Sequence, residues 1–323
     1  MYTHFFGLQR KPFDMTPDPA FLFLTGQHRE ALAGVSYALL EAKGFVVLMG
    51  EAGTGKTTLL RSALQSLPKE RVQFSLVLHP TLTPNEFLEL ALMDFGVEKV
   101  PKSKAQRLQK LQTLLLEGQA AGRISALVVD EAHKLSAELL EEIRLLGNFE
   151  RADRKLLQIV LAGQSELDEL LNREELWQFK QRVAVHLSIQ SLSATEVSQY
   201  IVHRWTKAGG TDLPIPTDAI ALISHISRGI PRVINAICDN ALMLAFAEGS
   251  ATVTLAHVTE VARDLHLAEP AARKIPQEAI TVPPVPLAPP QLRTVERYAP
   301  ASTPSRLSRW ANKLGIPQKV ETP

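Results

Sequence analysis

The residues best suited to chemistry lie between Phe45 and Arg61, in the stretch FVVLMGEAGTGKTTLLR. A short apolar run leads into a glycine-rich segment, and a helical pattern follows it. Its central residues match the pattern G-x-x-x-x-G-K-[ST] at every fixed position, with the required strand before it and helix after it. The stretch therefore predicts a phosphate-binding loop, made of Gly50, Glu51, Ala52, Gly53, Thr54, Gly55, Lys56, Thr57 and Thr58.

Each part of this loop has a physical role in binding a nucleoside triphosphate. The glycines allow a tight backbone turn, so that successive amide N–H groups point at phosphate oxygens. Lys56 reaches the β- and γ-phosphates as a point charge, and the Thr57 hydroxyl is suited to ligate Mg²⁺. The following helix adds its positive dipole end.

Two carboxylates follow a second apolar run, SALVVD, which ends at Asp130 and is followed by Glu131. In a nucleotide hydrolase, Asp130 would hold Mg²⁺ through its water shell and Glu131 would polarise the attacking water. The tetrapeptide DEAH, which begins at Asp130, also occurs in a class of helicases. Because 323 residues leave no room for a second motor domain, we treat that match as coincidence.

Three further polar residues are candidates for the same site. Gln164 follows the next expected strand and is either a partner of the γ-phosphate or attacking water, or an ordinary loop residue. Arg182 precedes the last expected strand and is either a surface residue or one that reaches a neighbouring subunit's nucleotide. Arg232 stands near the start of a helix, where a positive charge does not favour the helix itself, so we expect it to face the nucleotide phosphates.

The elements that must position these residues alternate between strand and helix. Such alternation predicts an α/β fold, a parallel sheet with helices on both faces. After Ser193 the pattern becomes helical only, which predicts a small α-helical lid. Besides the strand that begins at Phe45, the expected strands are 72–78, 125–130, 156–162 and 183–187. The expected helices, besides the one that follows the phosphate-binding loop, are 28–42, 84–95, 137–146, 195–208, 217–227, 231–248 and 255–265.

Composition limits the class of protein. Apolar residues make up 45% of the chain, enough for a sizeable core, and the single cysteine, Cys238, cannot form an internal disulfide. No apolar run approaches the roughly 18 to 20 residues that span a bilayer, and the first twelve residues do not resemble a signal peptide. We therefore expect a cytoplasmic protein without a transmembrane segment. The formal charge of +1 supports no general claim about nucleic acid.

The two ends of the chain differ from its middle. The first 24 residues hold five of the twelve phenylalanines, which we expect to pack on the following domain, although one ring could instead line the nucleotide base. From Ala271 proline dominates, which predicts an extended spacer. The last segment, SRLSRWANKLGIP, is a basic amphipathic stretch that either docks on a membrane surface or protein partner, or is a disordered tail.

A run of basic residues from Lys99 to Lys110 has two interpretations. It could contact a phosphate backbone, but no aromatic residues are interleaved with it, so a solvated helix face is the preferred interpretation.

Taken together, these segments resemble the AAA+ ATPases, and more narrowly the general secretion pathway protein A family, whose relatives include ATPases of exopolysaccharide and exosortase systems. The resemblance covers about 265 residues. It rests on the segments MYTHFFGLQRKPFDMTPDPAFLF, HREAL, GEAGTGKTTLLR, VVDEAHKLSAELLEEIRLLGNFE, LLQIVLAGQSEL, FKQRV and SRGIPRVINAICDNALMLAFAEG.

The resemblance implies binding and hydrolysis of ATP with Mg²⁺. It makes Gln164 the first sensor, Arg182 an arginine finger acting across a subunit boundary, and Arg232 a second sensor carried by the lid. It thus implies a homo-oligomer, either a ring or a filament. His79 and Ser165 depart from the family pattern, as does the proline-rich end, where the family's secretion members continue into a membrane span and a cell-wall-binding domain.

We expect a cytoplasmic ATPase whose assembly drives or regulates an envelope machine for secretion or exopolysaccharide export. A peripheral position at the inner membrane is compatible with this expectation. One alternative is a DNA-binding ATPase of the transposition-regulator type, and another is a nucleotide switch with negligible hydrolysis. The expected domains are an N-terminal aromatic segment and first helix packed on the core (1–44), the nucleotide-binding core (45–191), the lid (192–268), a proline-rich linker (269–304) and a basic amphipathic tail (305–323).

Overall fold

The computed structural model describes residues 2–16, 18–68, 70–78, 81–152 and 154–267. The expectations for His79, for the linker at 269–304 and for the tail at 305–323 concern residues outside these ranges.

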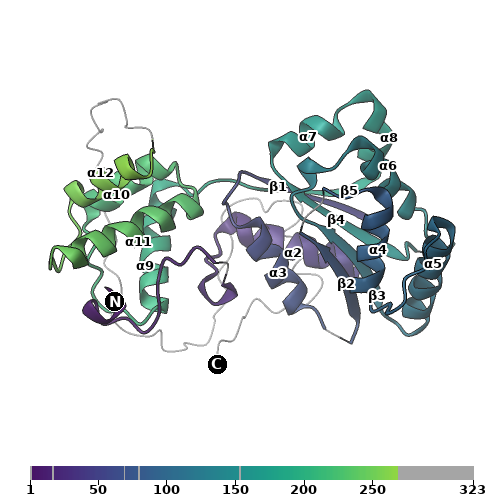
Figure 1. Ribbon diagram of the computed structural model, residues 1–323, viewed down its shortest axis with the longest axis horizontal. Helices are drawn as coiled ribbons and strands as arrows, with labels where there is room; N and C mark the ends of the chain where they lie inside the picture. The colour runs from purple at the N-terminus through teal and green to yellow at the C-terminus, as the bar shows by residue number, and fades with distance from the viewer. Residues whose placement is uncertain (1, 17, 69, 79–80, 153, 268–323) are drawn as a thin grey trace, which may run out of the picture. The chain divides into compact units, whose positions relative to one another are not determined.

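The core is a five-stranded parallel sheet with the order β2-β3-β4-β1-β5 (Figure 1). Helices cover both of its faces, so the central strands are buried along most of their length and are mainly apolar, without a regular alternation of apolar and polar residues. The α/β fold and each expected strand are confirmed. The strands are β1 (Phe45–Gly50), β2 (Val72–Val77), β3 (Ile124–Val129), β4 (Leu157–Gly163) and β5 (Val183–Ile189).

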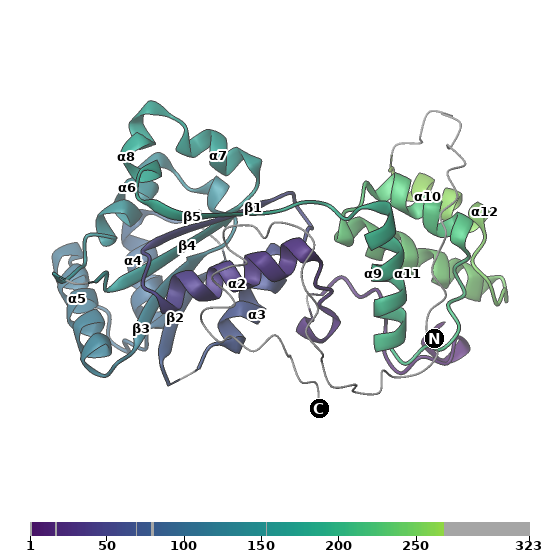
Figure 2. The ribbon, with the colours of Figure 1, turned by 180° about the vertical axis from the view of Figure 1, so that it is seen from behind.

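Two helices, α2 (Gly26–Leu40) and α3 (Lys56–Ser66), pack against each other and against β1, while α4 to α8 share one hydrophobic core with alternate residues of the strands (Figure 2). Local capping explains where several of these helices begin. Thr83 and Glu86 form a reciprocal capping box at the start of α4, with Pro84 at the first helical position. The remaining helices are α4 (Pro84–Asp94), α5 (Lys104–Ala120), α6 (Ala137–Leu146), α7 (Ser165–Leu171) and α8 (Trp177–Lys180).

The expected lid helices form a group with a hydrophobic core of their own. Ser193 and Glu196 form a capping box that begins the first of them, directly after the linker from β5. The helices are α9 (Ala194–Lys207), α10 (Thr217–Ser227), α11 (Pro231–Ala247) and α12 (Leu255–Asp264).

The N-terminal aromatic segment corrects one expectation. The aromatic segment and the first helix (1–44) were expected to pack on the nucleotide-binding core, but Phe13 and Phe21 are buried in the core of the lid, whereas α2 packs on the sheet. Arg204 of α9 donates to the Pro12 carbonyl at 2.5 Å, and its guanidinium lies 4.9 Å from the centre of the Phe21 ring. The aromatic rings thus complete the apolar core of the lid.

Among the described residues, no helix combines the length and the hydropathy needed to cross a bilayer.

Candidate functional site

Strand register brings the predicted site residues to one edge of the sheet. Met49 at the end of β1 pairs with Gly163 at the end of β4, and Val129 at the end of β3 pairs with Leu161 of β4. The phosphate-binding loop, Gln164 and Asp130 therefore follow three adjacent strands at their carboxyl ends. This edge is where ligands bind in open α/β sheets.

The phosphate-binding loop connects β1 to α3 and also touches the lid. Gly53 and Gly55 have φ angles of 80° and 99°, which other residues adopt only with strain. A β-carbon on Gly53 would lie 2.7 Å from Cβ of Arg232, and the Arg232 backbone N–H donates to the Gly53 carbonyl at 3.3 Å. The glycine thus permits close approach of the lid helix α11 to the loop.

Lys56 is the first residue of α3, and its side chain is buried at the base of the loop, with 5% of the residue exposed. Its Nζ donates to the carbonyls of Gly50 at 2.8 Å and Glu51 at 2.9 Å. Burial lowers the pKa of Lys56 below its usual value, although the charges of nearby carboxylates, Asp130 first among them, oppose the shift. An ammonium held out of water in this way favours an anionic ligand.

Thr57 and Asp130 lie together, as a shared Mg²⁺ site requires. The Thr57 hydroxyl donates to Oδ2 of Asp130 at 2.5 Å, and the carboxylate is 3% exposed. The described residues contain no cluster of three or more metal-ligating side chains that could hold an ion alone. These two oxygen donors nevertheless fit Mg²⁺, which usually takes one or two protein ligands and completes its coordination with phosphate and water.

Glu131 has a left-handed backbone conformation, with φ at 54°. Such a conformation costs a non-glycine residue of order 1–3 kcal/mol and is concentrated at functional sites. Its Oε2 lies 3.1 Å from Nζ of Lys134 and 3.6 Å from Nε2 of His133. Partial burial acts to raise the pKa of Glu131, but the hydrogen bond and charge of Lys134, with the charge of Lys56, lower it overall. The ionised form that a general base needs is therefore favoured.

His133, which was not predicted as a site residue, contacts both Glu131 and Gln164 and so links them. The Gln164 backbone N–H donates to Nδ1 of His133 at 3.4 Å, and its side-chain Nε2 lies 3.2 Å from Nε2 of His133.

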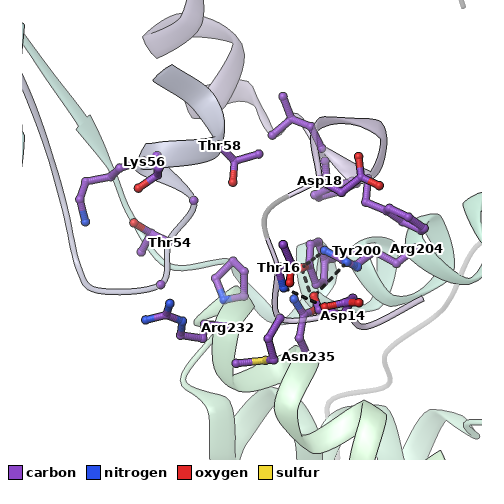
Figure 3. A pocket seen from close by; sticks show the side chains of 18 of the residues that line it. Asp14, Thr16, Asp18, Thr54, Lys56, Thr58, Tyr200, Arg204, Arg232 and Asn235 are labelled. Atoms are coloured by element: carbon purple, nitrogen blue, oxygen red, sulfur yellow. Dashed lines mark hydrogen bonds between the residues drawn. The ribbon is translucent and has the colours of Figure 1, made fainter. Parts of the chain in front are cut away.

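A pocket opens next to the loop and is lined from three parts of the chain (Figure 3). Lys56, Thr54 and Thr58 come from the loop and the start of α3, and Arg232 points toward the loop from α11. Phe21 and Phe23 line the same pocket, so the aromatic segment both fills the lid core and contributes to this cavity. That one of these rings lines the nucleotide base stays a prediction. Further lining residues that sequence reasoning missed are Asp14, His28, Tyr200, Arg204 and Asn235.

The missed lid residues form a buried polar network. Arg204 is 8% exposed and donates to the Tyr200 hydroxyl at 3.0 Å, and that hydroxyl donates to Asn235 at 2.8 Å. Tyr200 and Arg204 are four residues apart on α9, so they share one helix face. That spacing was visible in the sequence, but nothing in it showed that this face lines a cavity.

His28 connects the first helix to the loop. Its Nδ1 lies 2.7 Å from the hydroxyl of Thr25, the N-cap of α2, and its Nε2 lies 3.3 Å from the Thr54 carbonyl. Burial lowers the pKa of His28 and so favours the neutral ring, although the hydrogen bond to the Thr54 carbonyl opposes the shift.

Arg182 lies away from the site of its own chain. It immediately precedes β5, whose first residue pairs with Phe45 at the amino end of β1. The six residues of β1 separate this end from the loop by about 20 Å. Its guanidinium donates to Asn148 Oδ1 at 2.6 Å and to the Arg144 carbonyl at 3.2 Å.

A parallel sheet of this order, a phosphate-binding loop after β1, adjacent carboxylates after β3 and a helical lid define a P-loop nucleotide-binding protein of the AAA+ class. The family description "AAA domain" matches residues 39–171. More narrowly, the chain belongs to the general secretion pathway protein A family, as the resemblance predicted. It is 42% identical over 254 residues to general secretion pathway protein A of Aeromonas hydrophila, which is 77% of this chain and 46% of that relative.

Solved structures support the same fold. The ORC2 protein of Aeropyrum pernix, in ADPNP–ADP complexes, has a TM-score of 0.63 at 19% identity, covering 81% of this chain and 73% of that one. Cdc6p of Pyrobaculum aerophilum has a TM-score of 0.61 at 16% identity, covering 77% and 71%. At these identities the likeness concerns the fold alone. The chain spans less than half the length of its secretion-pathway relative.

Proposed function

We propose that this chain binds ATP with Mg²⁺ and hydrolyses it. The observation that carries the proposal is the contact of the Thr57 hydroxyl with the Asp130 carboxylate, with Glu131 as the next residue. The loop amides and Lys56 would hold the phosphates, and Thr57 and Asp130 would hold the metal ion, which neutralises charge on the phosphates when bound. Glu131 would take a proton from the attacking water, and Gln164 and Arg232 would contact the transferred phosphate.

Hydrolysis is tested with the purified chain and two variants. Lys56→Ala should lose ATP binding, whereas Glu131→Gln should retain binding and lose turnover, because the amide cannot accept the proton. Turnover by Glu131→Gln equal to that of the parent chain would exclude Glu131 as the base.

The position of Arg182 supports a second part of the proposal, that it acts on the nucleotide of a neighbouring subunit. Asn148 and the Arg144 carbonyl hold its guanidinium, and Arg182 precedes the strand end that the length of β1, about 20 Å, separates from the loop of its own chain. An arginine supplied in trans is worth roughly 10³–10⁵ in rate in phosphoryl transfer. Specific activity should therefore rise with protein concentration.

Mixing two inactive variants tests this directly. Lys56→Ala keeps Arg182 but cannot bind ATP, and Arg182→Ala binds ATP but lacks the arginine, so mixed assemblies should recover activity. The matched control is Arg173→Ala, because Arg173 is an exposed arginine whose nearest carboxylate, on Glu175, is 4.0 Å away. Full activity of Arg182→Ala at all dilutions would refute action in trans.

We further propose that nucleotide-dependent assembly of this cytoplasmic ATPase drives or regulates an envelope machine for secretion or exopolysaccharide export. The 42% identity to general secretion pathway protein A supports the secretion role. A pull-down in the Glu131→Gln background, with and without residues 269–323, tests it. Envelope components captured only by the full chain would support docking through the proline-rich linker and basic tail, whereas recovery of transposition proteins would refute the proposal.

DNA binding, the alternative, rests on the basic run from Lys99 to Lys110 and is not part of the proposal. Two residues of that run are engaged within the fold. Lys104 pairs with Glu142 at 2.7 Å, and Arg107 pairs with Glu89 at 2.7 Å.

A further inference from the structure

His133 lies between the two side chains to which we assign the attacking water and the phosphate. It belongs to the 3₁₀ turn Ala132–Lys134, labelled η2, which follows β3 and packs on β4 and α7. Its side chain is mostly buried, with 11% exposed. The tetrapeptide DEAH, set aside as coincidence from the sequence alone, thus contributes a residue with contacts of its own.

The contacts of His133 define which ring nitrogen carries the proton. Nδ1 accepts the backbone N–H of Gln164 at 3.4 Å, so a neutral ring has its proton on Nε2. That Nε2 lies 3.2 Å from the amide end of the Gln164 side chain and 3.6 Å from Oε2 of Glu131. Because the Gln164 amide is the nearer of the two groups, the N–H at Nε2 needs a hydrogen-bond acceptor on that amide.

The Gln164 amide can supply that acceptor by its orientation. The oxygen and nitrogen ends of a glutamine amide exchange places by a half rotation, and the hydrogen-bond network decides between them. Donation from Nε2 of His133 selects the orientation with Oε1 toward the ring, which leaves the NH₂ group directed away from it. Gln164 is the N-cap residue of α7, yet its side chain makes no capping hydrogen bond, so the amide is not committed to the helix.

We propose that His133 is a positioning residue for phosphoryl transfer. By donating from Nε2 to the Gln164 oxygen, it presents the Gln164 NH₂ group to the phosphate, beside the Glu131 carboxylate. The proposal rests on the proposed hydrolysis of ATP at this site. His133 itself touches no reacting atom, and its effect on the rate passes through Gln164.

The test is a double-mutant cycle in the full-length chain, with kcat, ATP affinity and thermal stability measured for each variant. Gln164→Ala removes the amide. His133→Leu removes both ring nitrogens at similar volume, and His133→Gln places an amide donor near the position of Nε2. The matched control is His186→Leu, an exposed histidine on β5.

We expect His133→Leu to lower kcat by about ten- to a hundredfold, the loss that follows removal of a partner that orients a site ligand. ATP affinity should stay within about twofold, His133→Gln should recover most of the rate, and the double variant should be no slower than Gln164→Ala. Three results would overturn the proposal. The double variant could lose kcat by the product of the two single losses, or His133→Leu could have an unchanged kcat. A fall in ATP affinity that parallels a fall in thermal stability would also overturn it.

The failure of this proposal can be told from failure of the proposed function. If the parent chain shows no more turnover than Lys56→Ala, the hydrolysis proposal fails. The orientation can then still be read from ¹⁵N-labelled protein, with His133→Gln used to assign the ring signals. A proton on Nε2 of His133, and a Gln164 side-chain amide signal that shifts in His133→Leu, support the positioning role. A proton on Nδ1 refutes it.

Discussion

Replacing Lys56 by Met separates ligand binding from folding at the phosphate-binding loop. Methionine keeps an unbranched side chain of similar length but removes the charge. In the structure this charge is 5% exposed, and burial lowers the pKa of Lys56, so the surroundings disfavour the ammonium relative to water. The variant loses bonds to the carbonyls of Gly50 and Glu51, but Gly50 is half-buried and Glu51 is exposed, so water can replace the donor.

The magnitudes indicate a small change in stability without nucleotide. A hydrogen bond to a charged group contributes about 1.5–3 kcal/mol when its partner would otherwise stay unsatisfied. Burial of the ammonium is itself unfavourable, so removing the charge offsets part of that loss. Since the two carbonyls stay hydrated, we expect the free energy of unfolding to change by no more than about 1 kcal/mol, or about 2–4 °C in Tm.

Thermal unfolding with and without MgATP gives the measurement. At 100 times the Kd, ATP should stabilise the parent chain by about 2.7 kcal/mol, which corresponds to about 5–11 °C. Lys56→Met should show no such shift, whereas Lys110→Met, which changes an exposed lysine on α5, should keep it in full. A loss of more than about 3 kcal/mol without nucleotide would show that the ammonium holds the fold together. A retained ATP shift would show that phosphate binding does not use Lys56.

Three further predictions concern the lid and its connections to the core. Gly229→Ala should destabilise the chain by about 2 kcal/mol or more in urea unfolding, because Gly229 has φ at 72° and a β-carbon would lie 1.9 Å from the Leu192 carbonyl oxygen. Gly249→Ala is the control: Gly249 has φ at 67° but open space around it, so the substitution should cost much less. The lowered pKa of His28 means that the unfolded chain binds a proton at this residue more readily than the folded chain does. The stability that the neutral His28 contributes is therefore complete above about pH 6.5 and is lost as the pH falls below that value. His28→Gln should reduce this dependence of the free energy of unfolding on pH. Arg204→Met should release the aromatic segment from α9, seen as faster proteolysis before residue 20 and weaker ATP binding; unchanged cleavage would refute the role of that guanidinium.

The core of the fold was predictable because each signal was local. The apolar runs that become β1, β3 and β4 are bounded by glycine, aspartate or glutamine, and the loop pattern requires no knowledge of other segments. Phosphate binding and the paired carboxylates follow from residues that are adjacent in sequence. Parallel pairing then brings their strand ends together without further information.

The remaining part of the site depends on contacts between segments that are distant along the chain. Arg204 meets the Pro12 carbonyl across 192 positions, and His28 meets the Thr54 carbonyl across 26. No periodicity or motif specifies such pairs, because either residue alone reads as an ordinary helix position. The aromatic segment was placed on the wrong core for the same reason, since apolar rings show that burial occurs but not against which surface.

The positions of the loop and Arg182 restrict the kind of assembly that could join them. The loop follows the carboxyl end of β1, and Arg182 precedes β5 at the opposite edge of the same sheet. If Arg182 acts on a neighbour's nucleotide, as proposed, one edge of a subunit meets the other edge of the next. A two-fold dimer makes this contact twice, so its single interface must include both the loop and Arg182, whereas a heterologous contact joins the two regions once per interface. The heterologous contact that the proposal implies closes into a ring or continues as a filament according to the rotation between subunits.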